Sequence, residues 1–241
     1  MVTMTGATAR AGRAAETREL IAMAAERLFA EHGVAAVSNR QISEAAGQGN
    51  NAAVGYHFGS KADLVRAIVR RHAEPTEQVR RRLLAGIGGS PDLRDWVDCL
   101  VRPIPEHLAA LGNPSWYARF AAQVMTDPVL RAVTIDAGYA DPAVRRTLDG
   151  LGRCIPALPR YVRAERADMA RHLITHTCAE RERALADGSA TLQTSWEHTA
   201  IALTDAITGL LSAPVTSTST TSTSASQSAR PDRPKPKETQ P

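Results

Sequence analysis

Apolar residues recur along this chain at steps of three and four, the spacing that is typical of one face of an amphipathic helix. Between 17 and 32 they form one continuous stripe, and Gly33 stands where a helix would end. Ser38 can cap a second, shorter helix that ends near Gly47. No segment shows the strict alternation of a half-buried strand. The pattern therefore predicts an all-α fold.

The following residues predict a tight helical corner. A polar turn over 48–51 leads into a third short helix over 52–58. Gly59 and Ser60 then precede a long helix that begins at Lys61, and Pro75 predicts its end or a kink. Three helices and the start of a fourth thus follow one another closely, so the second and third must be stabilised by packing on their neighbours.

Aspartate and proline mark helix starts in the rest of the chain. In Asp127-Pro128 and Asp141-Pro142 the aspartate can cap a helix whose first residue is the proline. A last helix is expected over 191–211. It carries a narrow apolar stripe that is typical of helix-on-helix packing, formed by Leu192, Trp196, Ala200, Leu203, Ile207 and Leu210.

These signals divide the chain into four parts. Residues 1–13 are small and polar without apolar periodicity, so we expect a mobile arm. Residues 14–60 form a compact helical head, and residues 61–213 form a larger helical domain. Residues 214–241 are a Ser/Thr tract followed by a Pro- and base-rich end, which predicts a disordered tail.

Composition narrows the classes of function. Hydrophobic residues make up 43% of the 241 residues and aromatic residues only 4%, which suits an aliphatic helical core. No apolar run reaches the roughly 18 residues of a membrane span, and no signal peptide is visible, so we expect a cytoplasmic protein without a membrane partner. Cys99, Cys154 and Cys178 have neither disulfide nor zinc spacing. The net charge of +4 favours a nucleic-acid partner only weakly.

The helical corner has the layout of a DNA-binding helix-turn-helix. The major groove admits one helix, and the preceding helices hold that helix against the backbone. Arg40 on the second helix, and Asn50, Asn51, Tyr56 and His57 around the third, can hydrogen-bond phosphates or base edges. On spacing alone, a corner with a purely structural role is an alternative.

The stretch from Thr17 to His72 resembles the TetR family of one-component regulators. The resemblance is carried by Phe-Ala-Glu-His-Gly at 29–33, Val-Ser-Asn-Arg-Gln-Ile at 37–42, Ala-Ala-Gly at 45–47 and Tyr-His-Phe-Gly-Ser-Lys-Ala-Asp-Leu at 56–64. Gly55 stands where the family commonly has an aromatic residue, and the turn at 49–51 is longer than is common. Both departures bear on which side chains would meet the bases.

The resemblance implies a helix-turn-helix DNA-binding domain at 14–60 and an effector-binding and dimerisation domain at 61–213. It implies that Phe58 belongs to the core of the head. It also implies contacts with DNA from the starts of the second and long helices and from the recognition helix, at Ser38, Asn39, Arg40, Asn50, Asn51, Ala52, Tyr56, His57 and Lys61.

A TetR-like regulator is expected to bind a palindromic operator as a homodimer, and a small-molecule effector is expected to release it. The sequence thus predicts a repressor that is not an enzyme and has no cofactor, with double-stranded DNA, an effector and a second copy as partners. The alternative is a helical small-molecule-binding or metal-dependent protein whose N-terminal corner is only structural.

Two further sets of residues are expected in the larger domain. An apolar effector pocket is expected around an aromatic-rich segment, although aromatic residues at helical spacing are also typical of ordinary core. Its members would be Trp96, Trp116, Tyr117, Arg119, Phe120, Met125 and Tyr139. The dimer interface would contain Met169, Leu173, Trp196, Ala200, Leu203, Ile207 and Leu210.

His172 and His176 stand one helical turn apart, which is a spacing that metal sites use. The glutamate that would follow the first histidine in a metalloprotease motif is absent. A pair of polar side chains near a helix interface explains the spacing more simply, so no metal site is predicted.

Overall fold

The computed structural model describes residues 4–139, 141–155, 157–189 and 195–216. Within these residues the chain is helical and has no strand, which confirms the all-α prediction. The described helices are α1 (Met4–His32), α2 (Asn39–Ala45), α3 (Ala53–Phe58), α4 (Lys61–Ile87), α5 (Leu93–Val101), α6 (Pro103–Leu111), α7 (Tyr117–Thr126), α8 (Pro128–Tyr139), α9 (Pro142–Cys154), α10 (Arg160–Ala186) and α11 (Trp196–Ser212).

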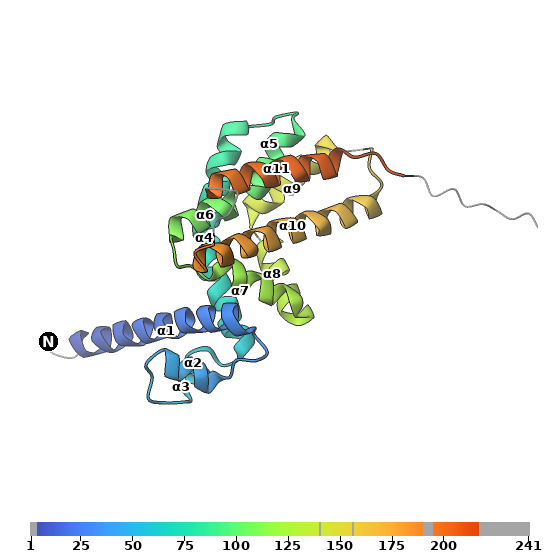
Figure 1. Cartoon of the computed structure of the whole chain (residues 1–241). Helices are drawn as coiled ribbons and strands as arrows, with labels where there is room; N and C mark the ends of the chain where they lie inside the picture. Colours follow the sequence, from blue (N-terminus) through green and yellow to red (C-terminus); the bar gives the residue numbers. More distant parts are fainter. Residues whose placement is uncertain (1–3, 140, 156, 190–194, 217–241) are drawn as a thin grey trace, which may run out of the picture.

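Helices α1 to α3 and the start of α4 surround an apolar core at one end of the molecule (Figure 1), and Phe120 and Val124 of α7 and Leu130 of α8 complete it. Phe29, Ile42 and Phe58 are buried in it, so the expected core position of Phe58 is confirmed. The short helix α2 also has a capping box. The side chain of Ser38 accepts a hydrogen bond from the backbone N–H of Gln41, and the side chain of Gln41 accepts one from the backbone N–H of Ser38.

Helix α1 is longer than its apolar stripe. It ends as expected at His32, where Gly33 takes φ +85°, but it begins at Met4, inside the segment expected to be an arm. The N-terminal half projects away from the head (Figure 1) and is largely exposed. Alanine and arginine favour helix, and extending an existing helix requires no new nucleus. This segment therefore continues α1 without joining the core.

Helix α4 runs through Pro75 without ending, so the proline marks no boundary in this structure. A proline inside a helix lacks the N–H that would bind the carbonyl of Arg71. In the same turn the hydroxyl of Thr76 donates to the carbonyl of His72 at 2.7 Å. The head and the larger domain are thus joined by one 27-residue helix.

Two predicted helix starts are confirmed in the larger domain. The carboxylate of Asp127 accepts a hydrogen bond from the N–H of Val129 at 2.9 Å, just after Pro128 begins α8. The carboxylate of Asp141 accepts one from the N–H of Ala143 at 2.7 Å at the start of α9. Aspartate before proline therefore marked both starts correctly.

The second core lies between α5, α9, α10 and α11. Trp96 of α5 is fully buried there, and its ring lies directly against the backbone of α9 at Gly150. A Cβ atom at Gly150 would overlap this ring. The indole N–H donates to the carbonyl of Ser90 at 2.8 Å. Trp96, expected in an effector pocket, is thus a packed core residue.

The stripe on α11 packs inside the same core. Ala200, Leu203 and Ile207 are buried against the protomer's own helices, although they were expected at a dimer interface. Helical spacing shows that residues share a face, but it does not show what covers that face. These three side chains are therefore not accessible to a partner subunit.

Some expectations fall outside the described residues. Residues 191–194 of the expected last helix and residues 217–241 of the expected tail lie there, as does the side chain of Tyr139. Among the described helices, none is long and apolar enough to cross a membrane.

Candidate nucleic-acid interface, domain junction and cavity

The short helix α3 has a buried side and an accessible side. Ala53, Val54 and Phe58 face the core of the head, whereas Gly55 and Tyr56 are exposed. Tyr56 is 84% exposed, and a Cβ atom at Gly55 would meet nothing within 4 Å. A helix that is fixed by one side and open on the other can enter the major groove of DNA.

The residues before α3 form an ordered turn. Asn50 lies in this turn, and its side-chain oxygen accepts a hydrogen bond from the N–H of Ala52, the N-cap of α3, at 2.9 Å. Asn51 is exposed beside it. The side chain of Asn50 thus helps to fix the start of α3, and Asn51 and Ala52 lie at the accessible end of the helix.

Helix α2 lies next to α3 in the head (Figure 1). Ser38, Asn39 and Arg40 are all exposed there. Arg40 pairs with Glu44 at 2.7 Å on the surface. Exposed ion pairs of this kind contribute little to stability, so the guanidinium could exchange its partner for a phosphate at small cost.

Arg18 connects α1 to α3 and was not singled out from the sequence. Its guanidinium lies 4.0 Å from the centre of the Phe58 ring and donates a hydrogen bond to the carbonyl of His57. The contact holds the C-terminal end of α3 against α1. The two segments lie far apart in sequence and share no local motif, so the sequence pattern offered no signal for it.

Lys61 binds protein backbone. Its amine donates to the carbonyls of Val34 at 3.0 Å and Val37 at 2.6 Å, in the loop between α1 and α2. These bonds hold the start of α4 against the head, because the loop that contains both carbonyls leads directly into the N-cap of α2. The expected contact of Lys61 with a phosphate remains a prediction.

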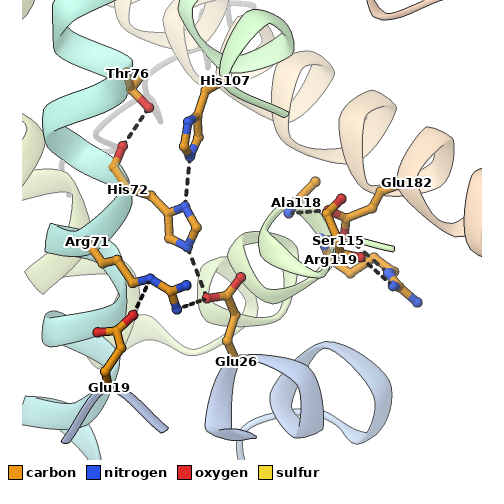
Figure 2. A network of polar contacts seen from close by, with 10 residues as sticks. All are labelled: Glu19, Glu26, Arg71, His72, Thr76, His107, Ser115, Ala118, Arg119 and Glu182. Atoms are coloured by element: carbon orange, nitrogen blue, oxygen red, sulfur yellow. Dashed lines mark hydrogen bonds and ion pairs between the residues drawn. The ribbon is translucent and has the colours of Figure 1, made fainter. Parts of the chain in front are cut away.

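A buried polar network joins the head to the larger domain (Figure 2). Glu26 of α1 lies 3.0 Å from the Nε2 atom of His72 on α4, and the Nδ1 atom of His72 lies 2.7 Å from the Nε2 atom of His107 on α6. Glu26, His72 and His107 are buried. Arg71 extends the network to Glu26 at 3.4 Å and to Glu19 at 2.9 Å. We call these five residues the domain junction.

An aromatic ring covers one side of the domain junction. Tyr117 of α7 stacks on His72 with 3.8 Å between ring centres. Burial, together with the neighbouring His72, lowers the pKa of His107 to about 4. His107 is therefore neutral near pH 7, so one of its ring nitrogens can accept a hydrogen bond and the other can donate one.

A second buried ion pair holds α7 to α10 (Figure 2). The carboxylate of Glu182 accepts hydrogen bonds from the hydroxyl of Ser115 at 2.8 Å and from the N–H groups of Ala118 and Arg119 at 3.2 and 2.9 Å. It also pairs with the Arg119 guanidinium at 3.2 Å. Glu182 thus satisfies the first N–H groups of α7, a place where a negative charge is favourable.

A cavity of about 670 Å³ lies in the larger domain, among α4, α5, α6, α8, α9, α10 and the end of α11. Its apolar lining includes Leu100, Ile104, Leu148, Leu151, Ile155 and Ile174. Its charged lining residues are Arg80, Arg163, Asp168 and Arg171. The volume and the largely apolar lining match those of small-molecule sites in other proteins.

Two family models match this chain. The model described as bacterial regulatory proteins of the tetR family matches residues 21–68, and the model of the tetracyclin repressor-like C-terminal domain matches residues 98–209. Together they match more than half of the chain. The chain belongs to the TetR family. The first match contains α2 and α3, and the second contains most of the residues that line the cavity.

A curated relative agrees with this assignment. The chain is 30% identical over 135 residues to the HTH-type transcriptional repressor AcnR of Corynebacterium glutamicum. The aligned region covers 54% of this chain and 62% of the relative, so it spans less than two thirds of that protein.

In this TetR-family chain, the described aromatic residues that were expected in an effector pocket lie outside the lining of the cavity. Phe120 packs in the core of the head, where its ring lies 6.2 Å from that of Phe29. Trp116 and Tyr117 pack against the same core. Arg119 is held by Glu182, and none of these residues lines the cavity. Met125, the remaining described member of the set, is half-buried and contacts Arg171 from outside the lining.

Helices α10 and α11 have a second, exposed side. Met169 and Leu173 of α10 are exposed, as is Ile201 of α11. Trp196 and Leu210, two other residues expected at the dimer interface, are half-buried against the protomer's own core. Exposed large apolar residues on two packed helices are what a symmetric helical interface needs.

His172 and His176 also lie on the exposed side of α10, with 6.1 Å between ring centres. In the described part of the chain, no group of three or more His, Cys, Asp or Glu side chains is placed to hold a metal ion.

Proposed function

We propose that this TetR-family protein is a transcriptional repressor that binds a palindromic operator as a homodimer and leaves it when a small molecule occupies the cavity. The observation that carries the proposal is the accessible side of α3, where Tyr56 is 84% exposed on a helix whose other side is buried. The relative AcnR, which bears the name of a repressor, supports the direction of control.

The proposed contacts with DNA fall into two groups, those with the major groove and those with the phosphate backbone. Tyr56, with Asn51 and Ala52 at the start of α3, faces the groove, while Ser38 and Arg40 at the start of α2 contact the phosphate backbone. Two heads related by a two-fold axis read the same sequence in opposite directions. The operator is therefore an inverted repeat.

Dimerisation uses the exposed side of α10 and α11. Met169, Leu173 and Ile201 provide apolar area, and the small residues Ala202 and Gly209 on the exposed side of α11 allow helices to approach closely. Pairing both helices with their symmetry mates makes a four-helix bundle across the two-fold axis.

Helix α4 connects the cavity to the head. It begins at Lys61, which is bonded to the head, and it reaches the cavity at Arg80, about 28 Å further along at 1.5 Å per residue. Between these points His72 is bonded to α1 and α6 through the domain junction. A ligand that shifts α4 therefore shifts the head and changes the spacing of two α3 helices in the dimer.

Reciprocal linkage follows from this arrangement. If the ligand lowers the affinity for DNA by a given factor, DNA lowers the affinity for the ligand by the same factor. The protein acts here as a regulator and not as an enzyme.

Selection from a pool of random double-stranded DNA tests the proposal. We expect the full chain to enrich an inverted repeat, and we expect the complex with one operator to contain two copies of the chain by sedimentation. We expect Tyr56→Ala to enrich no sequence and the control Tyr161→Ala to enrich the same repeat as the wild type. This result would show that sequence recognition depends on α3. Tyr161 is an exposed tyrosine on α10, outside the head. Failure of the wild-type protein to enrich any sequence would contradict the proposal.

A further inference from the structure

We propose that the cavity takes an apolar molecule that carries one anionic group, and that Arg163 binds this group. The inference deepens the proposed function, since it names the chemical class of the effector. It is carried by the lining of the cavity and by the pairing of its arginine side chains.

The body of the ligand must be apolar. Leu148 and Leu151 of α9, together with Ile155 just after this helix, line the cavity with Ile104 of α6 and Ile174 of α10. A polar body would lose its hydration among these side chains without gaining hydrogen bonds. An apolar body instead removes the same surface from water.

The charge of the ligand follows from which arginines are already paired. Arg80 binds Glu77 at 2.9 Å and the carbonyl of Cys99 at 2.6 Å. Arg171 binds Asp168 at 3.0 Å. Both of these lining guanidinium groups have protein partners, so neither provides an uncompensated charge.

Arg163 differs from the other two arginines of the lining. It is half-buried, and within the described residues no hydrogen bond or ion pair engages its side chain. The only acidic residue of the described lining is Asp168, which is engaged by Arg171. The cavity therefore has one positive charge to spare, which favours a single carboxylate, sulfonate or similar anion.

Two glycine residues leave space in the lining of the cavity. Gly138 of α8 and Gly152 of α9 line the cavity, and a Cβ atom at either would meet nothing within 4 Å. A Cβ atom at Gly152 would therefore extend into space that the lining leaves open. The exposed residues Ala164 and Ala167 of α10 also belong to the lining, so the cavity opens to the surface beside α10.

The test uses two fluorescent probes with the same apolar skeleton. 8-Anilinonaphthalene-1-sulfonate carries one anionic group, and N-phenyl-1-naphthylamine lacks it. Each is titrated against the full chain without DNA. We expect the sulfonate to bind with one site per protomer. We expect Arg163→Gln to weaken the sulfonate about tenfold, as loss of one charge-assisted contact would, and to leave the neutral probe unchanged.

Two further variants locate the site. Arg160→Gln removes an exposed arginine one turn earlier on α10, outside the lining, and we expect it to bind both probes as the wild type does. We expect Gly152→Leu to occupy part of the cavity and to weaken both probes. Circular dichroism checks that each variant is folded. If Gly152→Leu does not fold, Arg163→Gln alone still tests the inference.

Three results would overturn the inference. They are absence of sulfonate binding to the wild type, equal loss in Arg163→Gln and Arg160→Gln, and full binding by folded Gly152→Leu. A titration of operator DNA separates this inference from the proposed function. Specific sulfonate binding that leaves the affinity for DNA unchanged would keep the ligand class and reject effector release. DNA release by a compound that needs the cavity but does not need Arg163 would keep effector release and reject the ligand class.

Discussion

Helix α4 passes through two regions that differ in how their polar groups are satisfied. At the domain junction, His72 lies between Glu26 and His107 and under Tyr117, so the region is filled and each of the two histidines has a polar partner. At the cavity, space remains open, and Arg163 has no hydrogen-bond or ion-pair partner among the residues that the structure describes. A filled region moves as a unit, whereas an open region changes when a ligand enters. The difference suggests that the cavity receives a signal and the domain junction passes it on.

The largest effect is expected where a buried charge loses its partner. Glu182→Ala leaves the guanidinium of Arg119 and the first N–H groups of α7 without their acceptor. We expect the free energy of unfolding in urea to fall by about 3–5 kcal/mol. The control Glu180→Ala removes an exposed partner of Arg183 on the same helix and should change it by less than about 1 kcal/mol. Equal effects in the two variants would show that burial of this charge does not matter.

The domain junction should also make stability depend on pH. The pKa of His107 is lowered from 6.5 to about 4 in the folded protein, so the unfolded chain binds more protons in this range. The stability that neutral His107 contributes is therefore fully present above about pH 6.5. As the pH falls to about 4, the free energy of unfolding decreases by up to about 3 kcal/mol.

Unfolding measured at several pH values can isolate this contribution. We expect His107→Gln to lose less stability than the wild type between pH 6.5 and 4, because its amide does not titrate. The exposed His176→Gln on α10 serves as the control. A profile for His107→Gln as steep as that of the wild type would remove His107 as the cause.

A smaller effect separates the two sides of α9. Gly150 touches Trp96, whereas Gly152 faces the cavity. We expect Gly150→Ala to lower the free energy of unfolding by about 1–3 kcal/mol through overpacking. We expect Gly152→Ala to raise it by up to about 1 kcal/mol, because alanine favours helix and the space is open. If the melting temperatures of both variants shift in the same direction, Gly150 and Gly152 do not differ in packing as described.

The sequence was most informative where structure is local. The cap at Ser38, the end at Gly33 and the aspartates before Pro128 and Pro142 lie within a few residues of the groups they bind. Such contacts follow from residue type and spacing alone. The sequence pattern did not predict that α1 begins at Met4. This start depends on the helix propensity of the residues and on the extension of a helix that is already packed, and neither produces an apolar stripe.

The sites of the larger domain were harder to predict because they depend on which elements meet. Apolar spacing grouped Ala200 with Leu203 and Ile207 correctly, but it did not reveal that their own protomer buries them. Glu182 lies far along the chain from Arg119, and Arg18 lies far from His57. Most residues that line the cavity are aliphatic residues and glycine, and in a sequence these do not stand out from ordinary core.

The accessible side of α3 is tested most directly by the affinity for an operator at several salt concentrations. We expect Tyr56→Ala to weaken binding roughly tenfold or more at each salt concentration, and Tyr161→Ala to bind like the wild type. We also expect binding by all three proteins to weaken as salt rises, because phosphate contacts release counterions. If folded Tyr56→Ala binds the operator as tightly as the wild type does, α3 is not the helix that reads the DNA.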